Sequence, residues 1–330
     1  MVGFEGKSAL LTSSNTRAEL QDIYDPIIRE TLNSKSVFYN LVRREQNRGD
    51  YASWVLRTGR NSTYGSGGEQ PDVAGGYAGR VKCTTAIKMQ YAFPEVSDFM
   101  IAAQETAGVS REALFTEEVR LATEDLIGGG LDSASVKSGM NYQMFRDGTG
   151  NGSKNFLGLS AWVDDGTNNG GVATIAGVTR AATKPYMNAA SIDTTSAALT
   201  EGYLRAMIDA VQTAGASMND LLFVTTPALK TSVLNLMQPS QRFMTTDAKF
   251  GFRTLVNAPM FDDIPIYSDK DAESGKIYLL DMSTFALRTL KDVHYEDMGK
   301  TAASRKGKVA YYGELICYAP VKNAVCTTKT

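Results

Sequence analysis

Apolar residues between positions 200 and 290 follow two alternating periodicities. In some segments they recur three and four residues apart, as on one face of a helix, and in others they form short continuous runs typical of buried strands. The pattern predicts helices at 203–211 and 226–236 and strands at 221–225, 264–267 and 276–280. Gly215 follows the first helix, and Pro227 opens the second. This alternation predicts an α/β segment.

A longer helix is predicted from Ser110, a suitable N-cap, to Ile127, with three glycines at 128–130 to end it. Its apolar stripe comprises Phe115, Val119, Ala122 and Leu126, widened by Leu114 and Leu121. A second helix, capped by Asp132, is expected to run through 144–145 into a turn at 147–148. A shorter helix is expected to open at Asp25–Pro26.

Two strand-like runs, Tyr51–Arg57 and Arg80–Tyr91, enclose a glycine-rich stretch and predict a long hairpin. Seven glycines lie between Gly59 and Gly79. Because two strands cannot bury a core by themselves, such a hairpin is marginally stable in water. It is therefore either a loose surface loop or an arm that becomes ordered on another subunit.

Charge is unevenly distributed in a chain of 330 residues whose net charge, 34 − 36, is only −2. From Arg43 to Lys88 there are eight basic and four acidic residues, and from Glu95 to Asp132 there are nine acidic and two basic residues. We therefore expect a contact between subunits that joins these segments, although a solvated acidic helix face is the simpler alternative. The expected contact residues are Arg57, Arg60, Arg80 and Lys82 on the hairpin, and Glu117, Glu118 and Glu124 on the helix.

Two loops are predicted in addition. The composition of Asp164–Gly171, DDGTNNGG, is typical of a hairpin turn. The basic segment Lys300–Lys308 is expected to be a loop before a closing strand at Val309–Tyr318. Three roles remain open for the loop's Arg305, Lys306 and Lys308: a solvated turn, a contact between subunits, or a contact with nucleic acid.

Candidate catalytic chemistry is sparse, so we expect no catalytic, metal-binding or cofactor-binding residues. The single histidine, His294, excludes sites with two His ligands, and three scattered cysteines form no CxxC pair. We expect His294 to be a half-exposed strand residue. A hydrolase that pairs His294 with a serine is the remaining enzyme alternative, but the Gly-x-Ser-x-Gly motif does not occur. No apolar run approaches the ~18 residues of a membrane span.

The order of these parts resembles that of the major capsid proteins of tailed viruses, which have the HK97 fold. The stretches that carry the resemblance are the glycine-rich hairpin, the acidic helix, FRDGTGNGSKNFLGL (Phe145–Leu159), FVTTPA (Phe223–Ala228), DIPIY (Asp263–Tyr267) and GELICYAPVKNAVCT near the end. The resemblance implies an α+β fold with an N-terminal arm (1–44) and an E-loop hairpin (45–93). It also implies a P-domain (94–156 and 286–312) with a spine helix at 110–127, and an A-domain (157–285 and 313–330).

The same resemblance implies a structural protein that assembles into hexamers and pentamers of an icosahedral shell around viral double-stranded DNA. The shell would belong to the virion and assemble in the host cytoplasm. Its expected partners are other copies of the chain, non-specifically bound DNA, a portal and a decoration protein. Because the chain starts at Met1 without a coiled-coil extension, we also expect a scaffolding protein that is separate or removed. An encapsulin, a cellular shell of the same fold around an enzyme cargo, is the near alternative.

Overall fold

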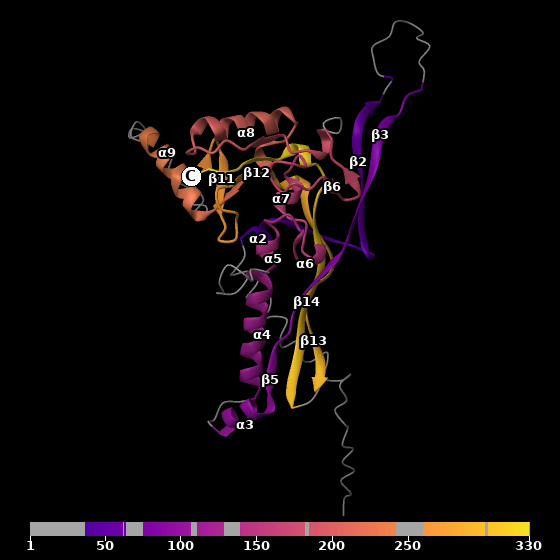
Figure 1. Cartoon of the computed structure of the whole chain (residues 1–330), viewed down its shortest axis with the longest axis vertical. Coiled ribbons are helices and arrows are strands. Elements are labelled where there is room, and N and C mark those ends of the chain that lie inside the picture. Colours follow the sequence, from indigo (N-terminus) through magenta and orange to yellow (C-terminus); the bar gives the residue numbers. More distant parts are fainter. Residues whose placement is uncertain are drawn as a thin grey trace, which may run out of the picture. The chain divides into compact units, whose positions relative to one another are not determined.

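The computed structural model describes residues 37–61, 63, 75–106, 111–128, 139–181, 185–241, 260–300 and 303–329 (Figure 1). The chain forms two compact units. The described residues of the first lie within Met89–Gly139 and Lys291–Tyr312, and those of the second lie within Ser36–Lys88, Met140–Leu290 and Gly313–Thr330. The predicted helix at Asp25–Pro26 and the predicted caps Ser110 and Asp132 lie outside the described residues.

A six-stranded sheet forms the centre of the second unit, in the order β10-β11-β9-β12-β15-β8. Its strands are β8 (Ser191–Asp193), β9 (Leu221–Thr225), β10 (Met260–Phe261), β11 (Ile264–Ser268), β12 (Ile277–Asp281) and β15 (Ala324–Cys326). All five residues of β9 and all five of β12 are buried, as their continuous apolar runs predict. Because β9 pairs in parallel with β11 and antiparallel with β12, the sheet is mixed.

Two helices complete this α/β segment: α8 (Glu201–Thr213) and α9 (Pro227–Gln241). The apolar side of α8 packs into the core formed by the sheet (Figure 1), and its buried members are Leu204, Met207, Ile208 and Val211. Gly215 follows at a φ of +85°, a conformation that glycine adopts without steric cost, and it ends the helix. The helices and strands predicted between 200 and 290 are therefore confirmed, with boundaries shifted by a few residues.

The predicted hairpin is present as an antiparallel pair of long strands, β2 (Tyr51–Asn61) and β3 (Ala78–Ala86) (Figure 1). The second predicted strand is divided, because Ile87 separates β3 from β4 (Lys88–Ala92). The Ile87 amide donates a hydrogen bond to the carbonyl of Asp50 at 2.8 Å, which closes the open end of the hairpin.

The first unit combines two helices with a sheet. Its elements are β5 (Glu95–Ser97), α3 (Asp98–Thr106) and α4 (Arg111–Gly128), together with parts of two long strands, β13 (Phe285–Lys300) and β14 (Ser304–Cys317). The sheet to which these strands belong has the order β1-β13-β14-β4, and β5 pairs with β14. The ring of Phe115 on α4 meets that of Tyr295 edge-on, with centroids 6.2 Å apart.

The predicted stripe of this helix is correct at Phe115 and Val119 but wrong at Leu121, which is exposed. Residues 119 and 121 are two positions apart and therefore project about 200° from each other around the helix. Thr123 is buried in the stripe, because its hydroxyl donates to the carbonyl of Val119 at 2.7 Å and so loses no hydrogen bond.

Short helices and strands connect the sheet, the two long helices and the hairpin of the second unit. They are α2 (Phe38–Leu41), β1 (Arg43–Gln46), α5 (Met140–Gln143), α6 (Gly150–Ser153), α7 (Leu159–Trp162), β6 (Thr174–Ile175), β7 (Val178–Thr179), η1 (Pro185–Met187), η2 (Met218–Asp220), η3 (Met282–Thr284) and η4 (Pro320–Lys322). The second predicted helix ends at Gln143, not at 144–145, and the turn at 147–148 is confirmed by a φ of +78° at Gly148.

We expect Gly307→Ala to destabilise the first unit. A Cβ at this position would lie 2.8 Å from Cζ of the buried Tyr295, so the mutation overpacks the sheet and should lower the unfolding free energy by about 2 kcal/mol. Urea denaturation followed by circular dichroism measures this change. Gly202→Ala in α8 is the control: its Cβ meets nothing closer than 3.8 Å, so the mutant should be as stable as the parent or slightly more stable.

Candidate functional site

The outer face of the hairpin is a candidate binding surface because it is largely exposed and its charged side chains, Arg57, Arg80 and Lys82, are all basic. Arg57 lies directly opposite Arg80 across the two strands, and Val55 lies opposite Lys82. Like charges in directly opposed positions destabilise a strand pair. Tyr51 and Val55, each 64% exposed, add apolar surface to the same face. The hairpin therefore presents a basic and apolar surface that is suited to an acidic partner.

The inner face of the hairpin fixes it to the rest of the second unit. Ala52 and Cys83 are buried. The indole ring of Trp54 lies 6.0 Å from that of Trp162 and 5.9 Å from the ring of Tyr318, which it meets edge-on. Aromatic pairs of this geometry each contribute roughly 0.5–1.5 kcal/mol beyond their burial. We call the cluster of Trp54, Trp162 and Tyr318 the hairpin root.

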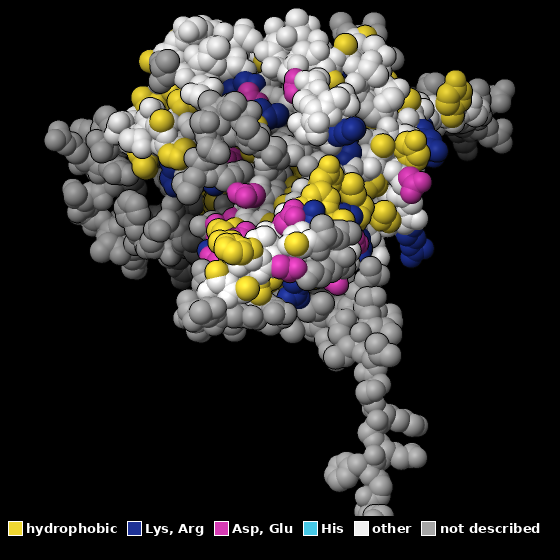
Figure 2. Space-filling model, turned by 60° about the horizontal axis from the view of Figure 1, so that its bottom comes forward, with side chains coloured by type: hydrophobic (Ala, Val, Ile, Leu, Met, Phe, Trp, Pro, Cys, Tyr) yellow, Lys and Arg dark blue, Asp and Glu magenta, His cyan; other side chains and the backbone are white. Residues whose placement is uncertain are grey.

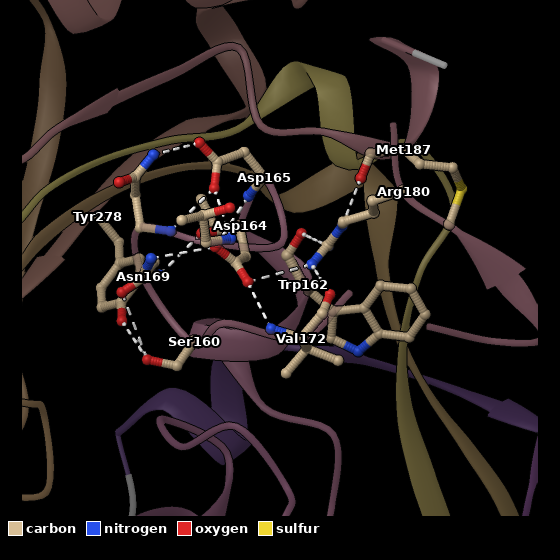
Figure 3. A network of polar contacts seen from close by, with 12 residues as sticks. Ser160, Trp162, Asp164, Asp165, Asn169, Val172, Arg180, Met187 and Tyr278 are labelled. Carbon is tan, nitrogen blue, oxygen red and sulfur yellow. Dashed lines mark hydrogen bonds and ion pairs between the residues drawn. The ribbon is translucent and has the colours of Figure 1, made fainter. Parts of the chain in front are cut away.

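A buried ion pair lies beside Trp162 of the hairpin root (Figure 3). The guanidinium of Arg180 lies 3.4 Å from the carboxylate of Asp164, and both side chains are almost completely buried. Arg180 also donates hydrogen bonds to the backbone carbonyls of Trp162, Val172 and Met187 at 3.0–3.1 Å. Burial lowers the pKa of Arg180, but the neighbouring carboxylate opposes this effect.

The predicted hairpin turn at Asp164–Gly171 is wrong, because this segment winds around the Asp164 carboxylate and does not join two strands. The carboxylate accepts hydrogen bonds from the amides of Asp165, Asn169 and Val172 at 2.8–3.0 Å (Figure 3). A small hairpin follows instead between β6 and β7, with its turn at Ala176–Gly177. Thr84 on β3 donates to the Ala176 carbonyl at 2.9 Å, which links this loop to the long hairpin.

A buried serine beside a lysine is the arrangement that comes closest to catalytic geometry. The Ser160 hydroxyl lies 2.8 Å from Nζ of Lys276 and 3.2 Å from the Tyr278 hydroxyl, and burial lowers the pKa of Lys276 to about 8. A serine with a neighbouring lysine base can act as a nucleophile. Here Lys276 is also ion-paired with Glu273, and Ser160 is only 2% exposed, so a substrate has no access. No sequence pattern indicates this pair, because its members are 116 residues apart.

His294 has structural contacts. It lies in β13 and is buried, not half-exposed as predicted. One ring nitrogen lies 2.7 Å from the Asp292 carbonyl and the other 2.8 Å from Glu296, and the ring stacks on Tyr312. The hydrogen bond with His294 and the ammonium of Lys308 lower the pKa of Glu296 to about 2. No nucleophile is among these contacts.

The remaining observations concern metal ligands, cysteines and membrane-spanning helices. In the described part of the chain, no group of three or more His, Cys, Asp or Glu side chains could hold a metal ion. The three cysteines are free thiols, and all are buried. Among the described helices, none is both long and apolar enough to cross a membrane.

The basic residues near 300–308 lie in a strand, so the predicted loop is wrong for most of its length. β13 continues to Lys300, and β14 begins at Ser304 because residues 304–306 pair with β5. Lys306 forms an ion pair with Glu95 at 3.1 Å, Lys308 forms one with Glu296 at 3.2 Å, and the Arg305 guanidinium lies over the ring of Phe115. These three cations therefore have partners within the first unit.

The acidic residues of α4 occupy an exposed surface of the first unit. Arg120 binds Glu117 at 2.5 Å and Glu124 at 2.5 Å, and hydrogen bonding to Arg120 lowers the pKa of Glu117. The structure thus brings Arg57, Arg80 and Lys82 together on the hairpin, and Arg60 is exposed further along β2. The three predicted contact glutamates, Glu117, Glu118 and Glu124, lie on one helix.

Exposed hydrophobic side chains in the first unit were missed by sequence reasoning. Met89, Tyr91 and Phe93 alternate along β4 and just beyond it, and all three are exposed. Phe99 and Met100 are exposed on α3. Figure 2 shows hydrophobic side chains gathered in patches between charged ones. The alternation at 89, 91 and 93 was the available signal, because alternate residues of a strand share a face.

Comparison with known proteins gives one family and one fold. The model of the SU10 major capsid protein family matches residues 132–315. Solved structures with a similar fold include the capsid of cyanophage A-1(L), with a TM-score of 0.67 and 15% identity, over 90% of this chain and 93% of that one. The Mycobacterium phage Bobi is also similar, with a TM-score of 0.53 and 10% identity, over 89% of this chain and 90% of that one.

A third similar structure is the SrpI encapsulin of Synechococcus elongatus, with a TM-score of 0.54 and 11% identity, over 88% of this chain and 86% of that one. At such low identity these structures establish the fold alone. No curated protein sequence matches the chain significantly.

We expect Arg180→Met to destabilise the second unit by about 3–5 kcal/mol, because it leaves the Asp164 carboxylate buried without its cation. Thermal unfolding followed by circular dichroism measures the loss. Arg205→Met is the matched control: it breaks an exposed pair with Glu201 and should change stability little. Equal losses in the two variants would contradict a special role for the buried pair.

Proposed function

The chain belongs to the SU10 major capsid protein family, whose model matches more than half of its residues, and we propose that its hairpin is an arm that binds a neighbouring subunit of the shell. It is a major capsid protein of a tailed phage with the HK97-like capsid fold. It is a virion component that assembles into multimeric shells. The family, the α+β fold class and the capsid function predicted from the sequence are therefore confirmed.

The observation that carries the proposal is the like-charged outer face of the hairpin. Arg57 and Arg80 repel each other in the free subunit, and an acidic neighbour converts that cost into attraction. The face also exposes Tyr51 and Val55, whose burial a partner surface would favour. The partner surface that we propose is the acidic face of α4 in another copy, where Glu117 and Glu118 lie beside the exposed Leu121.

The architecture of the shell follows from the same proposal. Arms that bind the next subunit form heterologous interfaces, which close into rings when the rotation between subunits is favourable. The proposed rings are hexamers and pentamers of an icosahedral shell around double-stranded DNA, assembled in the host cytoplasm. In domain terms, 1–44 would be an N-terminal arm, 45–93 the E-loop, 94–156 with 286–312 the P-domain, and 157–285 with 313–330 the A-domain. A portal, a separate scaffolding protein and a decoration protein are proposed partners.

Two alternatives have less support. The likeness to the SrpI encapsulin shows the fold alone, whereas the family match is to a viral capsid protein. For a hydrolase, His294 has no serine among its contacts, and Ser160 is inaccessible. The function that we propose is therefore structural and not enzymatic.

Removal of the hairpin tip tests the arm. We expect the deletion of Arg60–Gly79 to leave a folded subunit, because the buried root residues remain, and to lower the yield of shells by at least about tenfold, which corresponds to ~1.4 kcal/mol of lost contact. Negative-stain microscopy and light scattering measure the yield. A control that replaces 64–74 by a Gly-Ser segment of equal length should retain more shells. Normal shells from the deletion variant would refute the arm.

Charge reversal tests the partner. In Arg57→Glu/Arg80→Glu the opposed residues still carry like charges, so the free subunit should be as stable as the parent, whereas assembly should fail at low salt. The defect should shrink as salt rises, because screening acts over ~10 Å at 0.1 M. Combining this variant with Glu117→Lys/Glu118→Lys should restore shells. If the combined variant assembles no better than either double variant, α4 is not the partner.

A further inference from the structure

A buried ion pair lies where the hairpin continues into the next strand. Lys88, the first residue of β4, follows β3 after a single residue. Its Nζ lies 3.2 Å from the carboxylate of Glu314 on β14. The Glu314 side chain is 0% exposed and that of Lys88 is 15% exposed. Both residues belong to the second unit.

The carboxylate of Glu314 connects three segments of this unit. Its Oε1 accepts hydrogen bonds from the amides of Leu157 at 2.8 Å and Leu315 at 3.3 Å. Its Oε2 is buried and faces the Lys88 ammonium. Lys88 also donates a hydrogen bond to the Asn155 carbonyl. The pair therefore ties the start of β4, the loop at 154–158 and β14 together.

The Lys88–Glu314 ion pair lies next to the hairpin root. The indole N–H of Trp162 donates to the carbonyl of Leu315, the residue after Glu314, at 3.0 Å. Trp162 in turn packs against Trp54 of the hairpin. A change at Glu314 can therefore reach the hairpin by two routes, through Lys88, which lies two residues beyond the end of β3, and through Trp162 at the root.

The pKa of the Glu314 carboxyl lies close to neutral pH. Burial raises the pKa of Glu314 from an ordinary value of 4.5 to about 7, although the Lys88 ammonium and the Leu157 amide act in the opposite direction. The charged group that faces Glu314 from β4 is Lys88, and the loop and β14 contribute the backbone amides of Leu157 and Leu315. Between pH 8 and pH 6 the protonated fraction of Glu314 therefore rises from roughly one tenth to nine tenths.

We propose that Lys88 and Glu314 are positioning residues for the hairpin arm: their ion pair fixes the hairpin root, and proton uptake by Glu314 releases it. A neutral carboxyl no longer attracts Lys88, whose ammonium is better solvated outside the protein. The side-chain contact between the start of β4 and β14 is then lost, and only the strand pairing of β4 with β14 remains. This inference rests on the proposed role of the hairpin as an arm, but it concerns the free subunit and can be tested before any shell forms.

The two protonation effects have opposite signs, which makes the test specific. The pKa of Glu314 is higher in the folded than in the unfolded chain, so its contribution to global stability is complete below about 4.5 and is lost as the pH rises through about 7. Lowering the pH from 8 to 6 should therefore stabilise the fold globally through Glu314 while it loosens the hairpin locally. A merely structural pair would not separate these two responses.

Hydrogen exchange of the unassembled, full-length subunit measures the local response. After correction for intrinsic rates, the amide exchange rates of residues 51–61 and 78–86 should rise at least about fivefold as the pH falls from 8 to 6. This effect is on the scale of ~1 kcal/mol. Glu314→Gln should show fast exchange at both pH values. Lys88→Met should do the same, and Lys88→Arg should restore the pH dependence.

Urea denaturation between pH 8 and pH 6 measures the global response: relative to Glu314→Gln, the parent should gain stability as the pH falls. Asp193→Asn is the matched control. It breaks another ion pair of the second unit, with the buried Lys329 at 2.6 Å, and should leave the pH dependence of hairpin exchange intact.

Hairpin exchange that does not change with pH in the parent, or that still changes in Glu314→Gln, would overturn the inference. If Lys88→Met does not fold, the Glu314→Gln and Asp193→Asn pair decides alone. The arm has its own test, the assembly of the hairpin deletion, so that failure of the arm and failure of the ion pair give different results.

Discussion

The buried pair of Asp164 and Arg180 is the interaction on which the candidate site depends. The Asp164 carboxylate accepts hydrogen bonds from backbone amides of the loop that follows it. Arg180 donates hydrogen bonds to three backbone carbonyls, one of which belongs to Trp162. Trp162 then supports Trp54 and with it the base of the hairpin. Because a two-stranded ribbon buries too little surface to be stable alone, the hairpin needs such a fixed base.

Polar groups of the second unit serve chiefly to hold loops in place. Asn141 donates hydrogen bonds to the buried carboxylates of Asp269 and Asp271, and Ser160 is enclosed by Lys276, Glu273 and Tyr278. In an accessible cleft, a serine beside a lysine would suggest catalysis. In a capsid subunit the same contacts fix the position of long connections, so that each copy presents the same surface to its neighbours.

The exposed surfaces, unlike these buried polar groups, carry features that are unfavourable in the isolated subunit. Like charges face each other on the hairpin, and β4 and α3 expose large apolar side chains. Each of these features costs free energy in an isolated subunit. In the contacts between subunits that we propose, these side chains would be buried and the basic ones paired with acidic partners, which would offset these costs. Near-neutral net charge is compatible with such close packing of identical subunits.

Several elements were predictable from the sequence because their signals are local. The continuous apolar runs of β9 and β12, the stripe of α8 and the glycine at its end each depend on neighbouring residues, and all were placed correctly. The hairpin was also recognisable, since its strands and its glycines are contiguous. The order of these parts was sufficient to suggest the capsid fold.

Tertiary structure decided the features that depend on distant partners. The Asp164 carboxylate, which is paired with Arg180, holds the segment that follows it in a loop and not in a hairpin turn, and pairing with β5 places Arg305 and Lys306 in a strand. The pairs Ser160–Lys276 and Lys88–Glu314 join residues more than a hundred positions apart. Periodicity and composition describe neighbours along the chain, whereas the energies of buried charges depend on which groups folding brings into contact. The sequence therefore determined which elements form, and only the folded structure determined which charges they bury together.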